Sequence, residues 1–465
     1  MNTALPSRAP RRLLLTLNLG EVPEHIPSLR PRGTGRSAFS EHVDGGVIDR
    51  LLQHHGGTAR VARLHAPAAL AVGRAARPRY DDIEQLSGVA RVLRVELAED
   101  RGVHNLVDAL SQLPHVERVC ADRLCHAPFD AAPAAQRTQG KDRWRARDQI
   151  RLPQALGYEA GDPAVLIGLA DSGVMQQHAE LATQLRRGFD TVDLDPQIAA
   201  GMTLVGDDSG PDEDPLDEVG HGTACAGILV AQGADMPPGA AGTCGLTPAR
   251  VLGAALAPSG GRVGIGALSN IDAGMKRLID LGVKVINMSF GTPDSALAAT
   301  DPRPHTEIVR YALARSVILV AASGNSGLSE RYYPAAHDGV IAVGAVDGDS
   351  RPCAFSTRGD HVALCAPGRD ILTCGLDGYQ YASGTSFAAP FATAVCGLLA
   401  ARADRRAWPL TPDAVREILM GSACHFGVPG VEGCGSGVLD ALAALQALDA
   451  RIDEQVEGEA FGVSA

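Results

Sequence analysis

Five short apolar runs alternate with helical segments in the C-terminal two thirds of this 465-residue chain. By length and composition the runs are strands, and they cover residues 164–169, 251–256, 283–287, 317–322 and 339–346. Helical segments lie between them, at residues 222–232, 265–281 and 306–314. Fully apolar strands of this length are buried on both faces, so their alternation with helices predicts a parallel sheet covered on each side. We therefore expect an α/β domain with a doubly wound, mainly parallel sheet.

The composition argues against two broad classes of protein. The net charge is −12, whereas binding to nucleic acid phosphates requires basic patches, so we expect no nucleic acid partner. No apolar run approaches the ~20 residues that a membrane-spanning helix requires, so we expect no membrane span. Hydrophobic residues make up 45% of the chain but aromatic residues only 4%, which favours closely packed layers of small side chains.

The part of the chain before these strands has a different pattern. A strand is expected at residues 12–19, a half-buried strand at 89–97, and a helix at 103–113. An Ala- and Pro-rich run without periodicity follows, and the last residues of the chain are acidic. We therefore divide the chain into an α+β unit, a linker, the α/β domain and an acidic, frayed tail, covering residues 1–126, 127–143, 144–448 and 449–465.

The N-terminal sequence contains no recognisable export signal. Arg11 and Arg12 precede a short apolar run, but Asn18 interrupts it and no small-residue cleavage site follows. The ten cysteines are scattered without a Cys-x-x-Cys pair, so we expect free thiols in a reducing cytoplasm. If the protein is exported, the alternatives are the disulfides Cys120–Cys125 and Cys424–Cys434.

Four polar residues lie where predicted strands end or helices begin, each flanked by Gly, Ala or Ser. They are Asp171 in LADSGV, His221 in VGHGTACAGI, Asn325 in AASGNSG and Ser386 in SGTSFAAP. Acyl transfer needs a nucleophile, a base that takes its proton, a group that orients the base, and donors for the oxyanion. The set contains one residue type for each role.

Each of these residues also has a purely structural interpretation. Asp171 could cap a turn and His221 could begin a helix. Asn325 could occupy a left-handed position, and Ser386 could cap a closely packed strand-to-helix turn. The acidic stretch at 207–218 is either a solvated loop, a cation site or an attractant for basic substrates. It lacks the regular ligand spacing of a helix–loop–helix calcium site.

Together and in this order, the motifs resemble those of the subtilisin-like serine proteases, in which the chain order is Asp, His, Ser. The resemblance covers residues 144–445 and rests on DSG, GHGTACAGI, INMSFG, AASGN, YPAAHDGVIAVGAVD, FSTRGDHVALCAPG and SGTSFAAP. It implies a serine endopeptidase on a subtilisin-like α/β fold. Ser386 would be the nucleophile, His221 the general base and then acid, and Asp171 the orienting carboxylate. Asn325 would donate to the oxyanion together with the Ser386 N–H.

The resemblance also implies how a polypeptide substrate binds. The family holds its substrate as an added β-strand between two strands of the enzyme, and a third segment lines the first side-chain pocket. In this chain the residues of those segments would be Ser259, Gly260, Gly261, Ser289, Phe290, Gly291, Ser323 and Gly324. The chemistry requires no cofactor and no metal. Members of the family often carry structural calcium, for which this sequence gives no ligand set.

Residues 1–126 resemble the family's propeptide, an α+β chaperone and intramolecular inhibitor, through the stretch DALSQLPHVERVCADR. This resemblance implies cleavage between about Cys125 and Trp144. Without an export signal, we expect a cytoplasmic processing role, such as trimming a leader from a dedicated peptide. Two alternatives are a catalytically silent peptide-binding module held shut by residues 1–126, and an esterase-like hydrolase. A Gly-x-Ser-x-Gly motif would favour the latter, and Ser386 lies instead in GTSFAAP.

Overall fold

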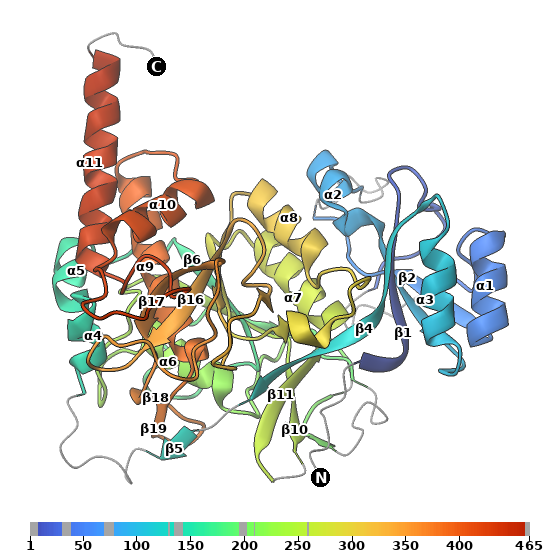
Figure 1. The fold of residues 1–465 in the computed structure, drawn as a ribbon, viewed down its shortest axis with the longest axis horizontal. Coiled ribbons are helices and arrows are strands. Elements are labelled where there is room, and N and C mark those ends of the chain that lie inside the picture. The colour runs from blue at the N-terminus through green and yellow to red at the C-terminus, as the bar shows by residue number, and fades with distance from the viewer. Residues whose placement is uncertain are drawn as a thin grey trace.

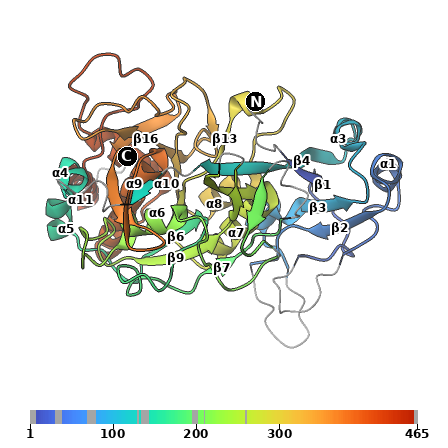
Figure 2. The same cartoon turned by 90° about the horizontal axis from the view of Figure 1, so that it is seen from below.

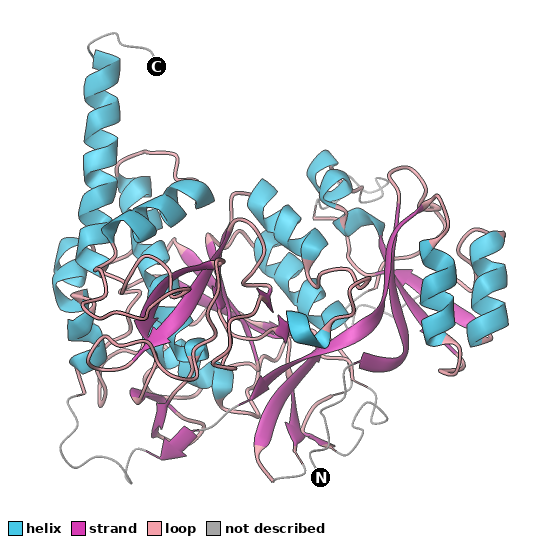
Figure 3. Ribbon diagram, viewed as in Figure 1, coloured by secondary structure: helices cyan, strands magenta, loops and turns pink. Residues whose placement is uncertain are grey.

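Two seven-stranded sheets organise the protein (Figures 1 and 3). The computed structural model describes residues 8–29, 39–68, 79–128, 131–133, 143–194, 202–208, 210–257 and 260–460. One sheet is parallel and belongs to the C-terminal part of the chain. The other is antiparallel, begins in the N-terminal part and ends in the C-terminal part.

The parallel sheet confirms the α/β fold expected from the alternating pattern. Its strands are almost entirely buried, as fully apolar strands should be. Their order is β17 (Val362–Pro367), β16 (Val340–Val346), β14 (Ile318–Ala322), β12 (Val285–Met288), β6 (Leu166–Asp171), β9 (Gly245–Arg250) and β7 (Phe189–Asp190).

Helices cover both faces of this sheet. One face packs against α4 (Arg145–Gln149), α5 (Leu152–Tyr158), α6 (His221–Val230), α9 (Thr385–Arg405), α10 (Pro412–Ser422) and α11 (Ala441–Ala460). The other face packs against α7 (Leu268–Asp280) and α8 (Thr306–Ala314). Among the described residues, α9 alone is long and apolar enough to cross a membrane, and 94% of its apolar window is buried inside the protein.

The prediction that residues 251–256 form a strand of the parallel sheet is wrong. That position is taken by β9, whose sequence GLTPAR is not an apolar run. Arg250 can be buried there because its guanidinium pairs with Asp190 and Glu218. Residues 251–256 instead contribute β10 (Gly253–Leu256), which forms an antiparallel hairpin with β11 (Arg262–Ala267). Helix α7 therefore begins at Leu268, not at residue 265.

The antiparallel sheet begins with four N-terminal strands, β1 (Arg8–Leu17), β2 (Ala59–Arg63), β3 (Val92–Leu97) and β4 (Val116–Pro128). One face packs against α1 (Val47–Gly56) and α3 (Val103–Ser111) through residues such as Leu13 and Leu93. The other face carries Leu14 and Val92, which join the core under α7 and α8. Helix α2 (Asp82–Ser87) contacts α8. Figures 1 and 2 both show these strands beside α7 and α8.

Strand β4 joins the two parts of the molecule into one sheet. Its last five residues, 124–128, pair with β11, and the sheet continues through β10 to β8 (Thr203–Val205). Further along, β5 (Ala131–Pro133) pairs with β19 (Tyr379–Ala382), which pairs with β18 (Ile371–Cys374). Part of the stretch expected to be a linker is thus hydrogen-bonded to the α/β domain.

The two-residue strands β13 (Thr292–Pro293) and β15 (Tyr332–Tyr333) pair with each other.

Helix α11 continues through the stretch that the sequence suggested to be an acidic, frayed tail. Leu448 and Ile452 on its inner face are buried in the core beside α9. Asp449 accepts two hydrogen bonds from Arg402, at 3.0 and 2.7 Å. Apolar packing on one face and ion pairing on another therefore keep this segment helical as far as Ala460.

Candidate active site

Asp171 and His221 meet at the carboxyl edge of the parallel sheet. Asp171 is the last residue of β6, and His221 is the first residue of α6. His221 Nδ1 lies 2.7 Å from Asp171 Oδ1, and both side chains are fully buried. The same carboxylate oxygen accepts the Ser172 N–H at 2.7 Å, which fixes its position. The bond holds the imidazole by Nδ1, so Nε2 is directed away from the carboxylate.

The carboxylate also changes the proton affinity of the imidazole. Burial by itself lowers the pKa of His221, but the attraction of Asp171 and its hydrogen bond outweigh burial, so the pKa is raised. Asp217 adds a further attraction. A higher pKa makes the neutral imidazole a stronger base, which favours proton transfer from a hydroxyl group.

Asp217 holds the start of α6, and it is not among the residues predicted for the site. Its carboxylate accepts hydrogen bonds from the Val219, Gly220 and Thr223 N–H groups and from the Ser172 and Thr223 hydroxyls, at 2.7–2.9 Å. This residue of the acidic stretch is therefore a buried helix cap, although neighbouring residues of the same loop are exposed. An aspartate shortly before an apolar helix is the pattern of an N-terminal cap, which is the signal that could have identified it.

Removing this cap should cost stability. We expect Asp217→Ala to lower the free energy of unfolding by about 3 kcal/mol, because several buried donors lose their acceptor at once. Urea denaturation measures the change, with both proteins in a Ser386→Ala background to prevent self-digestion. Asp214→Ala is the matched control, because Asp214 is exposed in the same loop and should change stability by less than about 0.5 kcal/mol. Equal effects of the two substitutions would contradict the capping role.

Ser386 lies in the first turn of α9, directly after β19. Its Oγ lies 3.3 Å from the carbonyl oxygen of Ser289. Pro390 has no N–H to donate to the Ser386 carbonyl, four residues earlier in the helix. That carbonyl instead accepts from Ser289 Oγ at 2.9 Å and from Cys225 Sγ at 3.4 Å. Because of the proline, the Ser386 carbonyl is available to accept hydrogen bonds from α6 and from the segment after β12.

Asn325 follows β14 and contacts the same turn of α9. Its Oδ1 accepts hydrogen bonds from the N–H and the hydroxyl of Thr385, at 2.8 and 2.9 Å. Because the amide oxygen is held in this way, the amide nitrogen Nδ2 is directed to the opposite side. A Cβ atom on Gly384 would lie 3.4 Å from Nδ2, so the glycine leaves room beside the amide. The Asn325 side chain is exposed, which lets a bound ligand reach it.

The structure therefore brings all four predicted residues to one edge of the parallel sheet. Asp171 is bonded to His221, and Asn325 is bonded to the residue before Ser386. The ring of the residue after Ser386 is centred 5.3 Å from the His221 imidazole. A hydroxyl, an imidazole, a carboxylate and an amide from distant parts of the sequence thus share one site.

Five of the predicted substrate-binding residues lie next to this site. Ser289 contacts Ser386 through both its hydroxyl and its carbonyl, and Phe290 and Gly291 follow it. The Gly324 N–H donates to the Thr385 hydroxyl at 3.2 Å, and Ser323 precedes it. A Cβ atom on Gly291 would come within 2.5 Å of the Tyr332 ring, so the chain fits there only without a side chain. The residues concerned are Ser289, Phe290, Gly291, Ser323 and Gly324.

The other three lie elsewhere. Gly260 and Gly261 belong to the turn that joins β10 to β11, and Ser259 lies outside the described residues. The strand on this side of the site is β11, which starts at Arg262. We use the word cleft for the interval between β11 and residues 289–291, which the end of β4 fills. The difference arises because residues 253–267 fold into a hairpin, so the strand that pairs across the cleft comes after the turn.

The end of β4 lies between the two segments that border the cleft. Residues 124–128 pair antiparallel with β11, and His126 forms an antiparallel bridge to Gly291 on the other edge. Beyond it, β5 pairs with β19, which leads within four residues to Ser386. The protein's own chain therefore occupies the position of an added strand across the site (Figure 1).

Among the described residues, one group of three could hold a metal ion, formed by Asp171, His221 and Cys225 with ligand atoms within 4.8 Å of one another. Two of its members are the hydrogen-bonded pair, whose imidazole is already oriented by the carboxylate. The acidic stretch before α6 contributes to ion pairs instead, since Glu218 binds Arg250 and Glu213 binds Arg277.

Comparison with known proteins assigns this arrangement to a family. The subtilase family profile matches residues 162–454. The chain belongs to the subtilase family. It is 31% identical over 342 residues to the thermophilic serine proteinase of Bacillus sp. (strain AK1), a match covering 73% of this chain and 75% of that protein. This subtilase is also 33% identical over 235 residues to the major intracellular serine protease of Bacillus subtilis (strain 168), covering 49% and 70%.

Solved structures show the same fold. The prenylagaramide maturation protease PagA superposes with a TM-score of 0.51 at 25% identity, covering 64% of this subtilase and 98% of PagA. The expected subtilisin-like α/β fold and the serine protease class are thereby confirmed. The protein is an enzyme that acts on polypeptides.

Proposed function

We propose that Ser386, His221 and Asp171 form the catalytic triad of a serine endopeptidase. Ser386 Oγ attacks the carbonyl carbon of a peptide bond while His221 Nε2 takes its proton, which gives a tetrahedral intermediate. The protonated His221 then donates to the leaving amine, and an acyl-enzyme remains. Water hydrolyses this ester by the same proton transfers. The buried 2.7 Å bond between His221 and Asp171 carries the proposal, because it orients the base and stabilises its cation.

Asn325 supplies a donor for the oxyanion in this scheme. Its oxygen is occupied by Thr385, so only the amide N–H can face negative charge in the cleft. The Ser386 N–H, in the first turn of α9, is the second donor. The Asn325 amide is held by its bonds to Thr385 and the Ser386 N–H lies in a helix, so little reorganisation is needed as charge develops.

Removing the Asn325 donor should slow turnover without weakening substrate binding. We expect Asn325→Ala to lower kcat about 10²- to 10³-fold and to change KM little. Asn325→Asp retains the oxygen that binds Thr385 but has no N–H, so it should lose as much as the alanine variant. Steady-state hydrolysis of a fluorogenic peptide measures both constants. An Asn325→Asp enzyme with near-normal kcat would show that the residue only positions Thr385.

The register of β4 supports a proposal for the site of self-cleavage. In an antiparallel pair, each step forward on one strand is a step back on the other. The bridge between His126 and Gly291 therefore places Pro128 opposite Ser289. Ser289 is the residue whose carbonyl oxygen lies 3.3 Å from Ser386 Oγ. We infer that the N-terminal domain is cleaved by its own active site, at the bond between Pro128 and Phe129.

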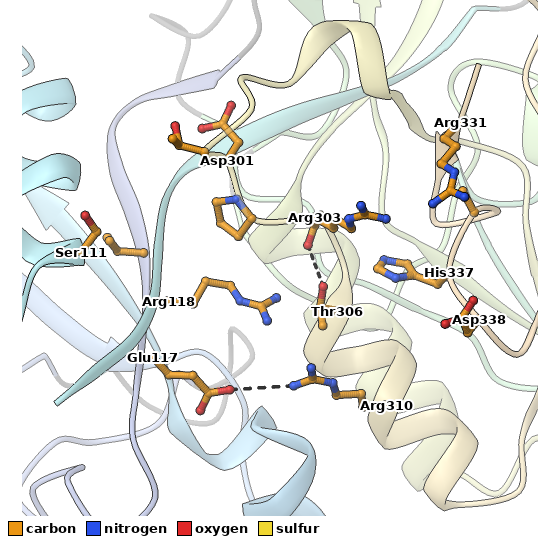
Figure 4. Close-up of a pocket in the computed structure, with 14 residues that line it drawn as sticks. Ser111, Glu117, Arg118, Asp301, Arg303, Thr306, Arg310, Arg331, His337 and Asp338 are labelled. Atoms are coloured by element: carbon orange, nitrogen blue, oxygen red, sulfur yellow. Dashed lines mark hydrogen bonds and ion pairs between the residues drawn. The ribbon is translucent and has the colours of Figure 1, made fainter. Parts of the chain in front are cut away.

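Until that bond is cut, the N-terminal domain acts as an intramolecular inhibitor and folding template. Side chains of β4 support this role through ion pairs with the α8 region, since Arg118 lies 3.5 Å from Glu307 and Arg310 lies 3.8 Å from Glu117. A cavity of about 550 Å³ lies between these elements and is lined largely by charged side chains, as Figure 4 shows. The interface is thus mixed, because this cavity is polar whereas Leu14 and Val92 of the same sheet pack into the apolar core under α7 and α8.

A cytoplasmic processing role is consistent with the thiols of this chain. All ten cysteines are free, including both pairs considered as alternatives for an exported protein, Cys120 with Cys125 and Cys424 with Cys434. One relative is named an intracellular serine protease, and PagA is named a maturation protease. We propose by analogy that this subtilase trims a dedicated polypeptide in a reducing compartment.

The test of the endopeptidase function is hydrolysis of an unfolded protein together with labelling by a fluorophosphonate. Wild type should digest reduced, denatured casein and take up one label at Ser386. A catalytically silent peptide-binding module would do neither. An esterase-like hydrolase would take the label and cleave nitrophenyl esters but leave casein intact.

A further inference from the structure

The side chain of Cys125 enters a closed polar pocket beside the cleft. It is fully buried, and its Sγ lies 3.3 Å from Thr292 Oγ1 and 3.8 Å from His305 Nε2. The Phe290 ring, centred 5.7 Å from the His305 ring, closes the apolar side of the pocket. Thr292 and His305 are themselves buried. A small side chain with a hydrogen-bonding group therefore fills this space.

His305 is held in place by Asp272 of α7. Its Nδ1 lies 2.5 Å from Asp272 Oδ1, and both side chains are buried. The backbone of His305 has a φ of 67°, a left-handed conformation that non-glycine residues rarely adopt without support from their surroundings. This residue precedes α8, so the strained turn aims the imidazole at the cleft strand.

Both ring nitrogens of His305 act as donors near neutral pH. Burial lowers the pKa of His305, but the attraction and hydrogen bond of Asp272, with a contribution from Cys125, outweigh burial and raise it to about 10. The imidazolium then donates from Nδ1 to Asp272 and from Nε2 to the Cys125 sulfur. The second hydrogen bond joins the sulfur and Thr292 Oγ1, and either atom can be its donor. The group in the pocket therefore accepts one hydrogen bond from His305 and shares another with the Thr292 hydroxyl.

We propose that this pocket selects substrates with cysteine, serine or threonine four residues before the cleaved bond. The inference rests on the proposed function, because Cys125 is the fourth residue before the bond that follows Pro128. An aliphatic side chain would leave the buried Nε2–H without an acceptor. A site built to hydrogen-bond its ligand rejects an analogue lacking the polar group much more strongly than an apolar pocket rejects an extra hydroxyl.

A peptide series on the wild-type enzyme tests the selectivity. Each peptide has the sequence X-His-Ala-Pro followed by a fluorogenic aminocoumarin, with X as Cys, Thr, Ser, Val or Ala. Thr and Val have nearly the same shape and differ in one hydroxyl group, so they form the decisive pair. We expect kcat/KM for Thr to exceed that for Val at least 10-fold, and that for Ser to exceed that for Ala. Equal rates, or faster cleavage of Val, would overturn the proposal.

Variants of the pocket show whether His305 is responsible. His305→Leu should reduce the Thr-to-Val ratio to about 1 or below, while Ser386 still reacts with a fluorophosphonate. His337→Phe is the matched control, because His337 is a neighbouring imidazole that bonds the Pro304 carbonyl and not Cys125. It should keep the wild-type ratio. A ratio that survives His305→Leu would contradict the assignment.

Self-cleavage of the full chain gives a second readout, in which the residue that fills the pocket is changed and the residues that line it, Thr292 and His305, are not. Self-cleavage should proceed within a few-fold of wild type in Cys125→Thr and at least 10-fold more slowly in Cys125→Val. Equal rates of the two variants would count against the pocket and leave the protease function standing. A chain that hydrolyses no peptide, does not cleave itself and takes no label at Ser386 would instead contradict the proposed function.

Discussion

Replacing Ser386 by alanine should lower kcat/KM about 10⁶-fold, the loss expected when the nucleophile of a nucleophile–base pair is removed. The residual rate would come from substrate binding and the oxyanion donors alone. Hydrolysis of a fluorogenic peptide, with enzyme concentrations matched by absorbance, measures the change. Because Ser386 is buried in the first turn of a core helix, loss of one oxygen atom there should leave the fold intact.

Ser422→Ala is the control for this substitution. Ser422 lies at the end of α10, and its hydroxyl bonds only the Ile418 carbonyl of the same helix among the interactions seen, at 2.7 Å. It should retain wild-type activity within about two-fold. If Ser386→Ala kept more than a few per cent of the wild-type rate with an unchanged circular dichroism spectrum, another residue would have to be the nucleophile.

Replacing Asp171 by asparagine should lower kcat about 10⁴-fold at neutral pH, because an amide stabilises the wrong tautomer of His221 and cannot balance its charge. The pH profile should change as well. His221 must be neutral to accept a proton, and its pKa is raised, so wild-type activity should fall as pH decreases through a value above 6.5. Without the carboxylate, that acidic limb should move to lower pH.

The measurement is kcat/KM of a fluorogenic peptide between pH 5 and pH 10 for both enzymes. Asp349→Asn is the control, because Asp349 is an exposed acid that pairs with Arg145 and does not contact the site. Its profile should superimpose on that of wild type. An acidic limb that stays in place in Asp171→Asn would mean that this carboxylate does not set the pKa of His221.

The residues of the proposed triad could be singled out because each lies in a local context that the sequence displays. Asp171 ends an apolar strand, His221 begins an apolar helix, and Ser386 follows a short extended run. Small residues around them mark places where the backbone is closely packed. The helix predicted at residues 306–314 was also found with the same bounds, since its start and its apolar face are both local signals.

The features that the sequence did not reveal depend on pairing between distant residues. Strand β9 contains Arg250, and an arginine in the sequence predicts an exposed position. It is buried here because the fold places Asp190 and Glu218 beside its guanidinium. The edge strand of the cleft begins after Gly260 and Gly261, whose Ser-Gly-Gly sequence is a turn signal that could have indicated the hairpin, but no local signal shows that β11 pairs with β4. The His305–Asp272 pair joins the starts of two helices separated by 33 positions, which no periodicity shows.

The most direct test of the whole account is the intact mass of the purified wild-type chain beside that of Ser386→Ala. We predict that the wild-type chain separates into two fragments and that the larger begins at Phe129, while the variant stays full length. That result would show an active triad with Pro128 held at the nucleophile. Two full-length chains, or a cut at the same place in both, would contradict self-cleavage by Ser386 and with it the assignment of β4 as the bound strand.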